Sequence, residues 1–296
     1  MSDIQDFPDA FDEGGPEIQG AGVRPVITLL SDFGVDDPYV SVMKGVILAI
    51  NPDVQIVDLS HAVPPFDILG GALILAASYH YFPKGTIHVA VVDPGVGGDR
   101  RGLLAATENY FFVGPDNGVF SHIYDDPFYL WTRQLRTVEF FLEKVSSTFH
   151  GRDVFAPVAG HLSTGESPER FGPTIEDPLR LERARAEVGP DGTISGEVIY
   201  VDRFGNLITN IDTTVFWEGE SRAGDLEEQE FLPVIEICGK TIRGMSEYYG
   251  AVARGELGAQ LNSWSRMEIF LPEGDASRAL KVGKGAPVKV RFERIA

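Results

Sequence analysis

Two apolar runs that each end in small and polar residues constrain how the first half of this 296-residue chain can fold. Residues 25–34 are PVITLLSDFG and residues 86–98 are TIHVAVVDPGVGG. A strand that is apolar on both faces is typical of a parallel sheet covered on both sides. Between the runs, residues 37–51 and 66–82 have helical apolar spacing, and residues 54–60 resemble a short strand. The sequence therefore predicts a largely parallel sheet with helices on both faces.

Further along the same half, residues 102–120 predict two more strands and a short helix, and residues 150–163 predict another helix. Residues 173–193 are polar and punctuated by proline and glycine, as in a linker. Residues 1–24 carry six acidic groups and few large apolar side chains, so we expect a disordered acidic tail.

Short strand-like runs separated by turn residues fill the second half and predict a small antiparallel barrel or sandwich. The runs are GEVIYVD, NLITNI, PVIEIC, KTIRGM, QLNSW, RMEIFL and PVKVRF. The predicted fold class is α/β. An N-terminal α/β sandwich with a mostly parallel sheet spans residues 25–182, and a smaller C-terminal antiparallel β-barrel-like domain spans residues 193–296.

The charge and cysteine content exclude several classes of partner. The chain has 25 Lys and Arg against 44 Asp and Glu, a net charge of −19 that would repel a nucleic acid. The single cysteine, Cys238, cannot form an internal disulfide, and no Cys/His spacing resembles a zinc site, so we expect no metal. The sequence shows no secretory signal and no apolar stretch of about 18 residues. We therefore expect a cytoplasmic protein with no nucleic-acid or membrane partner.

The first polar cluster, residues 31–37 (SDFGVDD), follows a predicted strand, where parallel sheets bind their ligands. The carboxylate of Asp32 can accept both hydroxyls of a ribose. The alternative is an ordinary strand-to-helix turn in which Asp36 or Asp37 caps the next helix.

The second cluster, residues 92–101 (VDPGVGGDRR), also follows a strand. Its glycines let a ligand approach the backbone, and Asp93 and Arg100 flank the loop so that both can face its cavity. The alternative is a tight Asp-Pro-Gly turn followed by a solvated arginine pair.

Three further residues have both a functional and a structural interpretation. His150 opens a predicted helix, a position that lowers a histidine pKa, although a single histidine is often structural. Asn206, in the turn DRFGN, can pair with the edge of adenine or simply complete a hairpin. Phe66, after two prolines, can stack on a sugar or base or belong to the core.

The order of these clusters is more specific than any one of them. The motifs SDFGVDD, HAVPPFD, DPGVGGDRR, GPDNG, FHGRDVFAP and DRFGNLITNI together resemble the S-adenosyl-L-methionine (SAM) hydroxide adenosyltransferases, which are adenosine-forming SAM hydrolases related to SAM-dependent fluorinases and chlorinases. The resemblance covers residues 25–293. It implies hydrolysis of SAM to adenosine and L-methionine by an activated water or hydroxide that attacks the ribose C5′. SAM is then the substrate, and no cofactor is expected.

The resemblance also assigns site residues and an assembly. It implies that Asp93, Arg100 and His150 form the catalytic Asp-Arg-His set, that Asp32 holds the ribose diol and that Phe66 packs against the sugar. It implies a homotrimer in which SAM lies between the N-terminal domain of one subunit and the C-terminal domain of its neighbour.

The remaining substrate contacts implied by the resemblance lie at both ends of SAM. Asp37 and Asp202 match positions that contact the methionine amino group, Asn206 one that contacts adenine, and Ser263 one that binds the methionine carboxylate. The chain departs from its relatives nearby. Trp264 stands where the halogenases carry arginine, and Pro272 stands where a small polar residue is usual near adenine.

Two alternatives accompany the hydrolase interpretation. The first is a SAM-dependent halogenase, but the positions of the two halide-binding hydroxyl residues fall near Val96 and at Gly151, and the halogenase insertion after the glycine-rich loop is missing. The second is a non-catalytic SAM or adenosine sensor, whose ligand binding would survive loss of Asp93.

Overall fold

The computed structural model describes residue 16 and residues 24–224 and 230–295. The predicted disordered tail lies outside the described residues, apart from Pro16 and Arg24. The chain divides into two compact units, Met1–Leu181 and Glu182–Ala296. None of the helices in the described ranges has both the length and the apolar character needed to cross a membrane.

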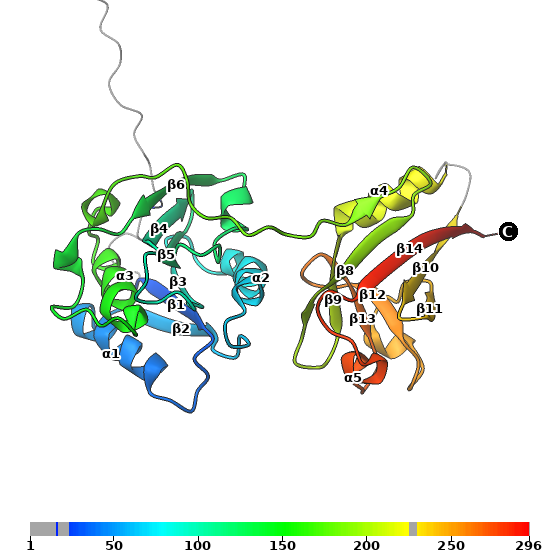
Figure 1. The fold of residues 1–296 in the computed structure, drawn as a ribbon, viewed down its shortest axis with the longest axis horizontal. Helices are drawn as coiled ribbons and strands as arrows, with labels where there is room; N and C mark the ends of the chain where they lie inside the picture. Colours follow the sequence, from blue (N-terminus) through cyan, green and yellow to red (C-terminus); the bar gives the residue numbers. More distant parts are fainter. Residues whose placement is uncertain (1–15, 17–23, 225–229, 296) are drawn as a thin grey trace, which may run out of the picture. The chain divides into compact units, whose positions relative to one another are not determined.

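A six-stranded mixed sheet forms the centre of the first unit, in the order β2-β1-β3-β5-β4-β6 (Figure 1). β1, β2, β3 and β5 run parallel to one another, and β4 runs antiparallel to β5 and β6. The mostly parallel sheet is thus confirmed. Its strands are β1 (Val26–Ser31), β2 (Gln55–Ser60), β3 (Ile87–Val91), β4 (Gly102–Thr107), β5 (Phe111–Pro115) and β6 (Tyr129–Gln134).

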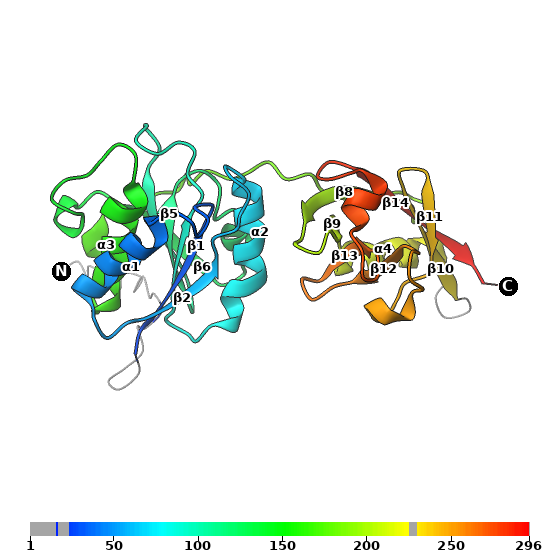
Figure 2. The ribbon, with the colours of Figure 1, turned by 90° about the horizontal axis from the view of Figure 1, so that it is seen from below.

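Helices cover both faces of this sheet. α1 (Tyr39–Ile50) and α3 (Ala156–Ser163) pack together on one face, and α2 (Ile68–Ser78) lies on the other (Figure 2). The central strands β1, β3 and β5 are buried on both faces, which explains their continuous apolar sequences. One apolar cluster lies on the α1/α3 side and a second lies on the α2 side. The short helices are η1 (Tyr79–Tyr81), η2 (Ile123–Asp125), η3 (Val138–Phe140), the π-helix η4 (Gly151–Phe155) and η5 (Pro168–Phe171).

An ionic cluster fastens the last residues of the first unit to its sheet. The guanidinium of Arg101 donates to Asp116 Oδ2 at 2.6 Å and to Asp177 Oδ1 at 2.8 Å. The backbone N–H of Leu179 donates to the other Asp116 oxygen at 2.7 Å. Arg101 is therefore bound, and the alternative of a solvated arginine pair is wrong.

An eight-stranded antiparallel sheet forms the second unit, in the order β11-β10-β14-β8-β9-β13-β12, with β7 paired to β8. The sheet curls into a nearly closed barrel, because its two edge strands, β11 and β12, approach each other. Just after β11, the Ser246 N–H donates to the Ala259 carbonyl of β12 at 2.7 Å. The barrel-like prediction is confirmed. The strands are β7 (Glu187–Val188), β8 (Ile194–Val201), β9 (Leu207–Asp212), β10 (Phe231–Ile237), β11 (Lys240–Arg243), β12 (Gly258–Leu261), β13 (Arg266–Phe270) and β14 (Pro287–Arg294).

The second unit also contains helices that the sequence analysis did not predict. α4 (Thr213–Ala223) begins where the Asp212 side chain accepts the Val215 N–H at 2.9 Å. α5 (Ala276–Leu280) begins at Asp275 in the same way, and η6 spans Tyr249–Ala251. The two aspartates are typical N-caps, a signal that the run of strand-like segments obscured.

Candidate active site

The polar clusters of the first unit meet at the carboxyl ends of neighbouring parallel strands. Ser31 at the end of β1 pairs with Val91 at the end of β3. Asp32 and Asp93 therefore lie within two residues of the ends of these strands. Adjacent strands in a sheet are about 4.8 Å apart, so the two aspartates are close neighbours. The position is the one that open α/β sheets use for ligands.

Asp93, Arg100 and His150 form one hydrogen-bonded array. Arg100 Nε donates to Asp93 Oδ1 at 3.0 Å, and Arg100 Nη2 donates to Asp93 Oδ2. Arg100 Nη2 also lies 2.8 Å from His150 Nδ1. The side chains of Asp93 and Arg100 are 3% and 11% exposed, and the guanidinium stacks over the Phe155 ring at 5.3 Å. The structure thus brings together three residues of which the first, Asp93, and the last, His150, are 57 positions apart in the sequence.

The array fixes the protonation state of the histidine. A guanidinium can only donate, so His150 Nδ1 must accept with its lone pair and the ring proton must lie on Nε2. Burial lowers the pKa of His150, and the neighbouring Arg100 cation lowers it further. The lowered pKa agrees with the sequence analysis, but the causes are burial and Arg100 rather than the helix terminus. His150 is therefore held neutral, and the backbone of Ser146 is a further hydrogen-bond neighbour of its ring.

A tight turn places His150 beside Arg100. Asp153 is fully buried and accepts the Ser146 N–H at 2.8 Å and the Arg152 Nε–H at 2.5 Å. Gly97 in the second cluster, with φ +76°, packs so closely that an added Cβ would lie 2.0 Å from the Ser147 carbonyl oxygen. The glycine is required there because the two loops touch backbone to backbone.

Gly151, which follows His150, is closely packed as well. An added Cβ would lie 3.2 Å from Met43 Sδ and 3.2 Å from the Phe149 ring. A larger residue at this position would require these neighbours to shift by a few tenths of an ångström.

Asp32 and Phe66 lie together on the same edge. The Phe66 N–H donates to Asp32 Oδ2 at 2.9 Å, and Phe66 has φ +67° with a side chain that is 71% exposed. An exposed aromatic ring in a left-handed backbone conformation is not a core residue, so that alternative is wrong. Asp32 Oδ1 remains the oxygen through which the carboxylate can meet a ligand.

The helix-capping alternative for the first cluster is also wrong. Pro38 occupies the N-cap of α1, and no side chain caps it. Asp36 and Asp37 are exposed in the loop that precedes the helix.

In the second unit, Asp202 and Asn206 form the β8–β9 turn together. Asp202 Oδ1 accepts the N–H groups of Phe204 and Asn206 at 2.9 and 2.8 Å, and Asp202 Oδ2 accepts Asn206 Nδ2 at 3.0 Å. The hairpin interpretation is therefore correct for the backbone. It does not exclude binding, because the amide oxygen of Asn206 and one Nδ2 hydrogen are not used by these bonds.

A cavity of about 580 Å³ lies next to this turn. Asn206, Tyr249 and Pro272 line it, with Phe204 and residues 271–275. The sequence analysis placed Asn206 and the Pro272 loop near one ligand group, and the structure places both on this cavity. Tyr249 also lines the cavity, but nothing in its sequence context distinguishes it. Ser263 is exposed in the β12–β13 turn, where the neighbouring Trp264 ring packs on Tyr200 at 5.6 Å.

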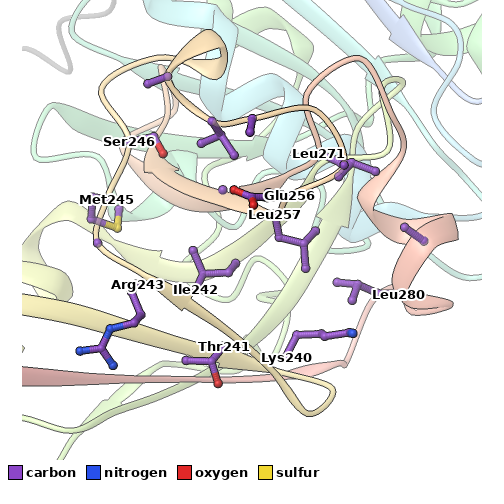
Figure 3. A pocket seen from close by; sticks show the side chains of 17 residues that line it. Lys240, Thr241, Ile242, Arg243, Met245, Ser246, Glu256, Leu257, Leu271 and Leu280 are labelled. Atoms are coloured by element: carbon purple, nitrogen blue, oxygen red, sulfur yellow. The ribbon is translucent and has the colours of Figure 1, made fainter.

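A larger cavity of about 880 Å³ lies between edge strand β11 and the segment that leads to β12 (Figure 3). Ile242 and Leu257 reach into it, and Lys240 and Arg243 lie at its margin. It contains none of the predicted site residues and shares Leu271 with the smaller cavity.

The described residues hold no group of three His, Cys, Asp or Glu side chains placed to bind a metal ion.

Comparisons with known proteins agree with the motifs. The model of the SAM hydroxide adenosyltransferase N-terminal domain matches residues 27–172, and that of the C-terminal domain matches residues 196–289. The chain is 37% identical to the (R)-S-adenosyl-L-methionine hydrolase of Thermus thermophilus, over 90% of this chain and all of that protein. It is 30% identical to the fluorinase of Nocardia brasiliensis, over 65% of this chain and 73% of that protein.

The fold agrees as well. The crystal structure of an uncharacterized conserved protein from Thermotoga maritima superposes with a TM-score of 0.81 at 34% identity and covers 89% of this chain and 99% of that one. Together the two domain models account for most of the sequence, in the predicted order. The chain belongs to the SAM hydroxide adenosyltransferase family.

Proposed function

We propose that this protein hydrolyses SAM to adenosine and L-methionine by a single displacement at the ribose C5′. The observation that carries the proposal is the Asp93–Arg100–His150 array at the carboxyl edge of the sheet. Relatives that are 32–37% identical over most of the chain are named SAM hydrolases. SAM is the substrate, and the reaction needs no further cofactor.

The leaving group explains why so few groups suffice. An oxygen–C5′ bond forms while the C5′–sulfur bond breaks, and the electron pair of that bond moves to the sulfonium, which becomes the neutral thioether of methionine. No general acid is needed for such a leaving group. The protein has to hold an oxygen nucleophile in line with the sulfur and partly remove its water shell.

The array favours hydroxide as that nucleophile. Arg100 Nε and Nη2 already bind Asp93 and His150, so a ligand of Arg100 binds at Nη1. His150 offers its Nε2–H. Two donors, one of them charged, stabilise hydroxide relative to water and lower the pKa of the bound water. Neither Asp93 nor His150 is a free base, because Arg100 engages both, so the proton leaves toward solvent.

The other site residues hold the substrate. Asp32 accepts a ribose hydroxyl through Oδ1, and the exposed Phe66 ring packs against the sugar. Asp37, exposed on the same edge, contacts the methionine amino group.

The 580 Å³ cavity of the second unit takes the adenine. The Asn206 amide oxygen can accept from the adenine amino group, while Tyr249 and Pro272 offer flat and apolar surfaces. Asp202 contacts the methionine amino group as well as holding the turn, and Ser263 binds the methionine carboxylate.

The two sets of residues lie in separate units of the chain. We propose that one SAM molecule is shared between the first unit of one subunit and the second unit of its neighbour in a homotrimer. Adenosine, methionine and SAM are then the small-molecule partners, without nucleic acid or membrane. The single cysteine fits a location in the cytoplasm.

Gly151 favours hydrolase over halogenase, because it offers no hydroxyl where the halogenases carry a halide-binding serine. The test is to incubate the protein with SAM in buffers with and without chloride or fluoride and to identify the products by mass spectrometry. We expect adenosine and methionine in every buffer and loss of both in Asp93→Ala. A 5′-halogenated adenosine would identify a halogenase. Tight SAM binding without products, retained in Asp93→Ala, would identify a sensor.

A further inference from the structure

A buried carboxylate that the proposed reaction does not use lies at the centre of the second unit. Glu268 on β13 is 2% exposed and receives hydrogen bonds from three neutral side chains. Tyr249 Oη and Gln260 Nε2 donate to Oε1 at 2.7 and 2.6 Å, and Asn262 Nδ2 donates to Oε2 at 3.0 Å. Burying a carboxylate is costly unless its oxygens are satisfied, so this network has to persist in the folded unit.

One branch of the network ends at the smaller cavity. Tyr249 lines that cavity together with Asn206, and its ring packs edge-on against Phe270 at 4.9 Å. The hydrogen bond to Glu268 fixes the direction of the phenol, and burial together with the Glu268 charge raises the pKa of Tyr249. Tyr249 therefore remains a neutral, oriented wall of the cavity.

The other branch ends at the turn that carries Ser263. Asn262 Nδ2 binds Glu268, and Asn262 Oδ1 accepts the N–H groups of Trp264 and Arg266 at 2.9 and 3.2 Å. The Ser265 N–H donates to the Asn262 carbonyl at 3.0 Å, in a turn where Ser265 has φ +56°. One amide thus shapes the whole turn, and Glu268 sets which way that amide faces.

We propose that Glu268 is a positioning residue that aligns the adenine-binding wall at Tyr249 with the methionine-binding turn at Ser263. This inference rests on the proposed function, because it takes the cavity and the turn as the two ends of the SAM site. It assigns a role to a side chain that touches no substrate.

The network also predicts which substitution is tolerated. A glutamine at position 268 can accept from Asn262 through its oxygen and donate to Tyr249 Oη and to a flipped Gln260 amide through its nitrogen. The flip exchanges one bond for another, because Gln260 Oε1, which has no hydrogen-bond partner in the described structure, then accepts while Nε2 gives up its bond to position 268. Methionine has a similar length but offers neither function.

The test compares Glu268→Met, Glu268→Gln and Glu236→Met by steady-state SAM turnover. Glu236 lies in the same sheet on β10 and forms a partly exposed pair with Arg291, so its substitution is a matched control. We expect Glu268→Met to raise KM about tenfold, the equivalent of one strong hydrogen bond, while kcat changes less than about threefold. We expect Glu268→Gln to restore KM and the control to leave it unchanged.

Tyr249→Phe keeps the ring but removes the hydrogen bond from Tyr249 to Glu268. This variant tests the same network if Glu268→Met does not fold. It should weaken adenosine binding, measured by calorimetry, and lower the melting temperature by several degrees, because the buried Glu268 carboxylate loses one of its three donors. An unchanged KM in a folded Glu268→Met, or an unchanged adenosine affinity in Tyr249→Phe, would overturn the positioning role. A wild-type protein that forms no adenosine would instead overturn the proposed function, so the two failures are distinguishable.

Discussion

His150 carries the sharpest consequence at the scale of single residues. Its neighbour Arg100 determines which ring nitrogen holds the proton, since a guanidinium cannot accept a hydrogen bond. In the proposed reaction the histidine is then a donor toward the nucleophile rather than the base that deprotonates it. Spacing in the sequence cannot yield this assignment, because it depends on a 2.8 Å contact between residues that are 50 positions apart.

The first prediction concerns the charge state of His150. Burial and Arg100 lower the pKa of His150, so the neutral form persists below pH 6.5. Protonation at lower pH breaks the hydrogen bond to Arg100, and we expect it to abolish activity. In ¹⁵N NMR spectra, assigned by the loss of signals in His150→Gln, we expect an Nε2–H tautomer and a midpoint below 6.5. Arg100→Met should move the midpoint upward, because a cation is removed. A proton on Nδ1 at neutral pH would contradict the array.

The same shift has a stability consequence. A histidine whose pKa is lowered by folding binds its proton more readily in the unfolded chain. Its contribution to the free energy of unfolding is therefore complete above pH 6.5 and decreases as the pH falls toward the folded pKa.

Among the secondary-structure elements, the segment that leads into η4 depends on a buried charge. The Asp153 carboxylate ties residue 146 to the π-helix and pairs with Arg152, so the segment that includes His150 cannot move independently of the helix. A π-helix at this point agrees with the tendency of such turns to occur at functional sites.

We predict that Asp153→Asn lowers the free energy of unfolding by about 1–3 kcal/mol, because the amide nitrogen then faces the Arg152 donor. It should also lower kcat, since His150 loses its fixed position. Glu139→Gln is the control: it removes a carboxylate from an exposed pair with Arg170 in the same unit and should change stability by less than about 0.5 kcal/mol. Equal denaturation midpoints for both variants would show that Asp153 does not hold the turn.

The elements differ in how far the sequence predicts them. Continuous apolar runs such as residues 26–31 specify buried parallel strands, and the polar residues after them mark the ligand edge. α4 was missed because its window is short and mixed, although Asp212 is a clear cap. Glu268 sits between Met267 and Ile269, and a charged residue in a strand pattern is ordinarily assigned to the solvent face. Its burial follows from three partners that the strand sequence does not indicate.

At the scale of the whole molecule, the proposed site is divided between the two units. The proposed catalytic array lies in Met1–Leu181 and the candidate adenine cavity lies in Glu182–Ala296. The sequence motifs predict both halves, but only the resemblance to known enzymes suggested that different subunits contribute them.

Sharing of the site between subunits predicts complementation. Asp93→Ala and Asn206→Ala damage different halves, so each variant should be inactive alone. In randomly mixed trimers about a quarter of the sites combine two intact halves, and co-refolding should restore about a quarter of the wild-type activity. Sedimentation should show trimers throughout. No recovery in mixed trimers, or an active monomer, would contradict a shared site.

Water attack at C5′ is tested most directly by running the reaction in H₂¹⁸O with SAM labelled by deuterium at one 5′ hydrogen. We predict one ¹⁸O atom in the 5′-hydroxyl of adenosine, none in methionine, and inversion of configuration at C5′, as a single displacement requires. Label in a methionine-derived product, or retention of configuration at C5′, would contradict hydrolysis by in-line attack of water on SAM.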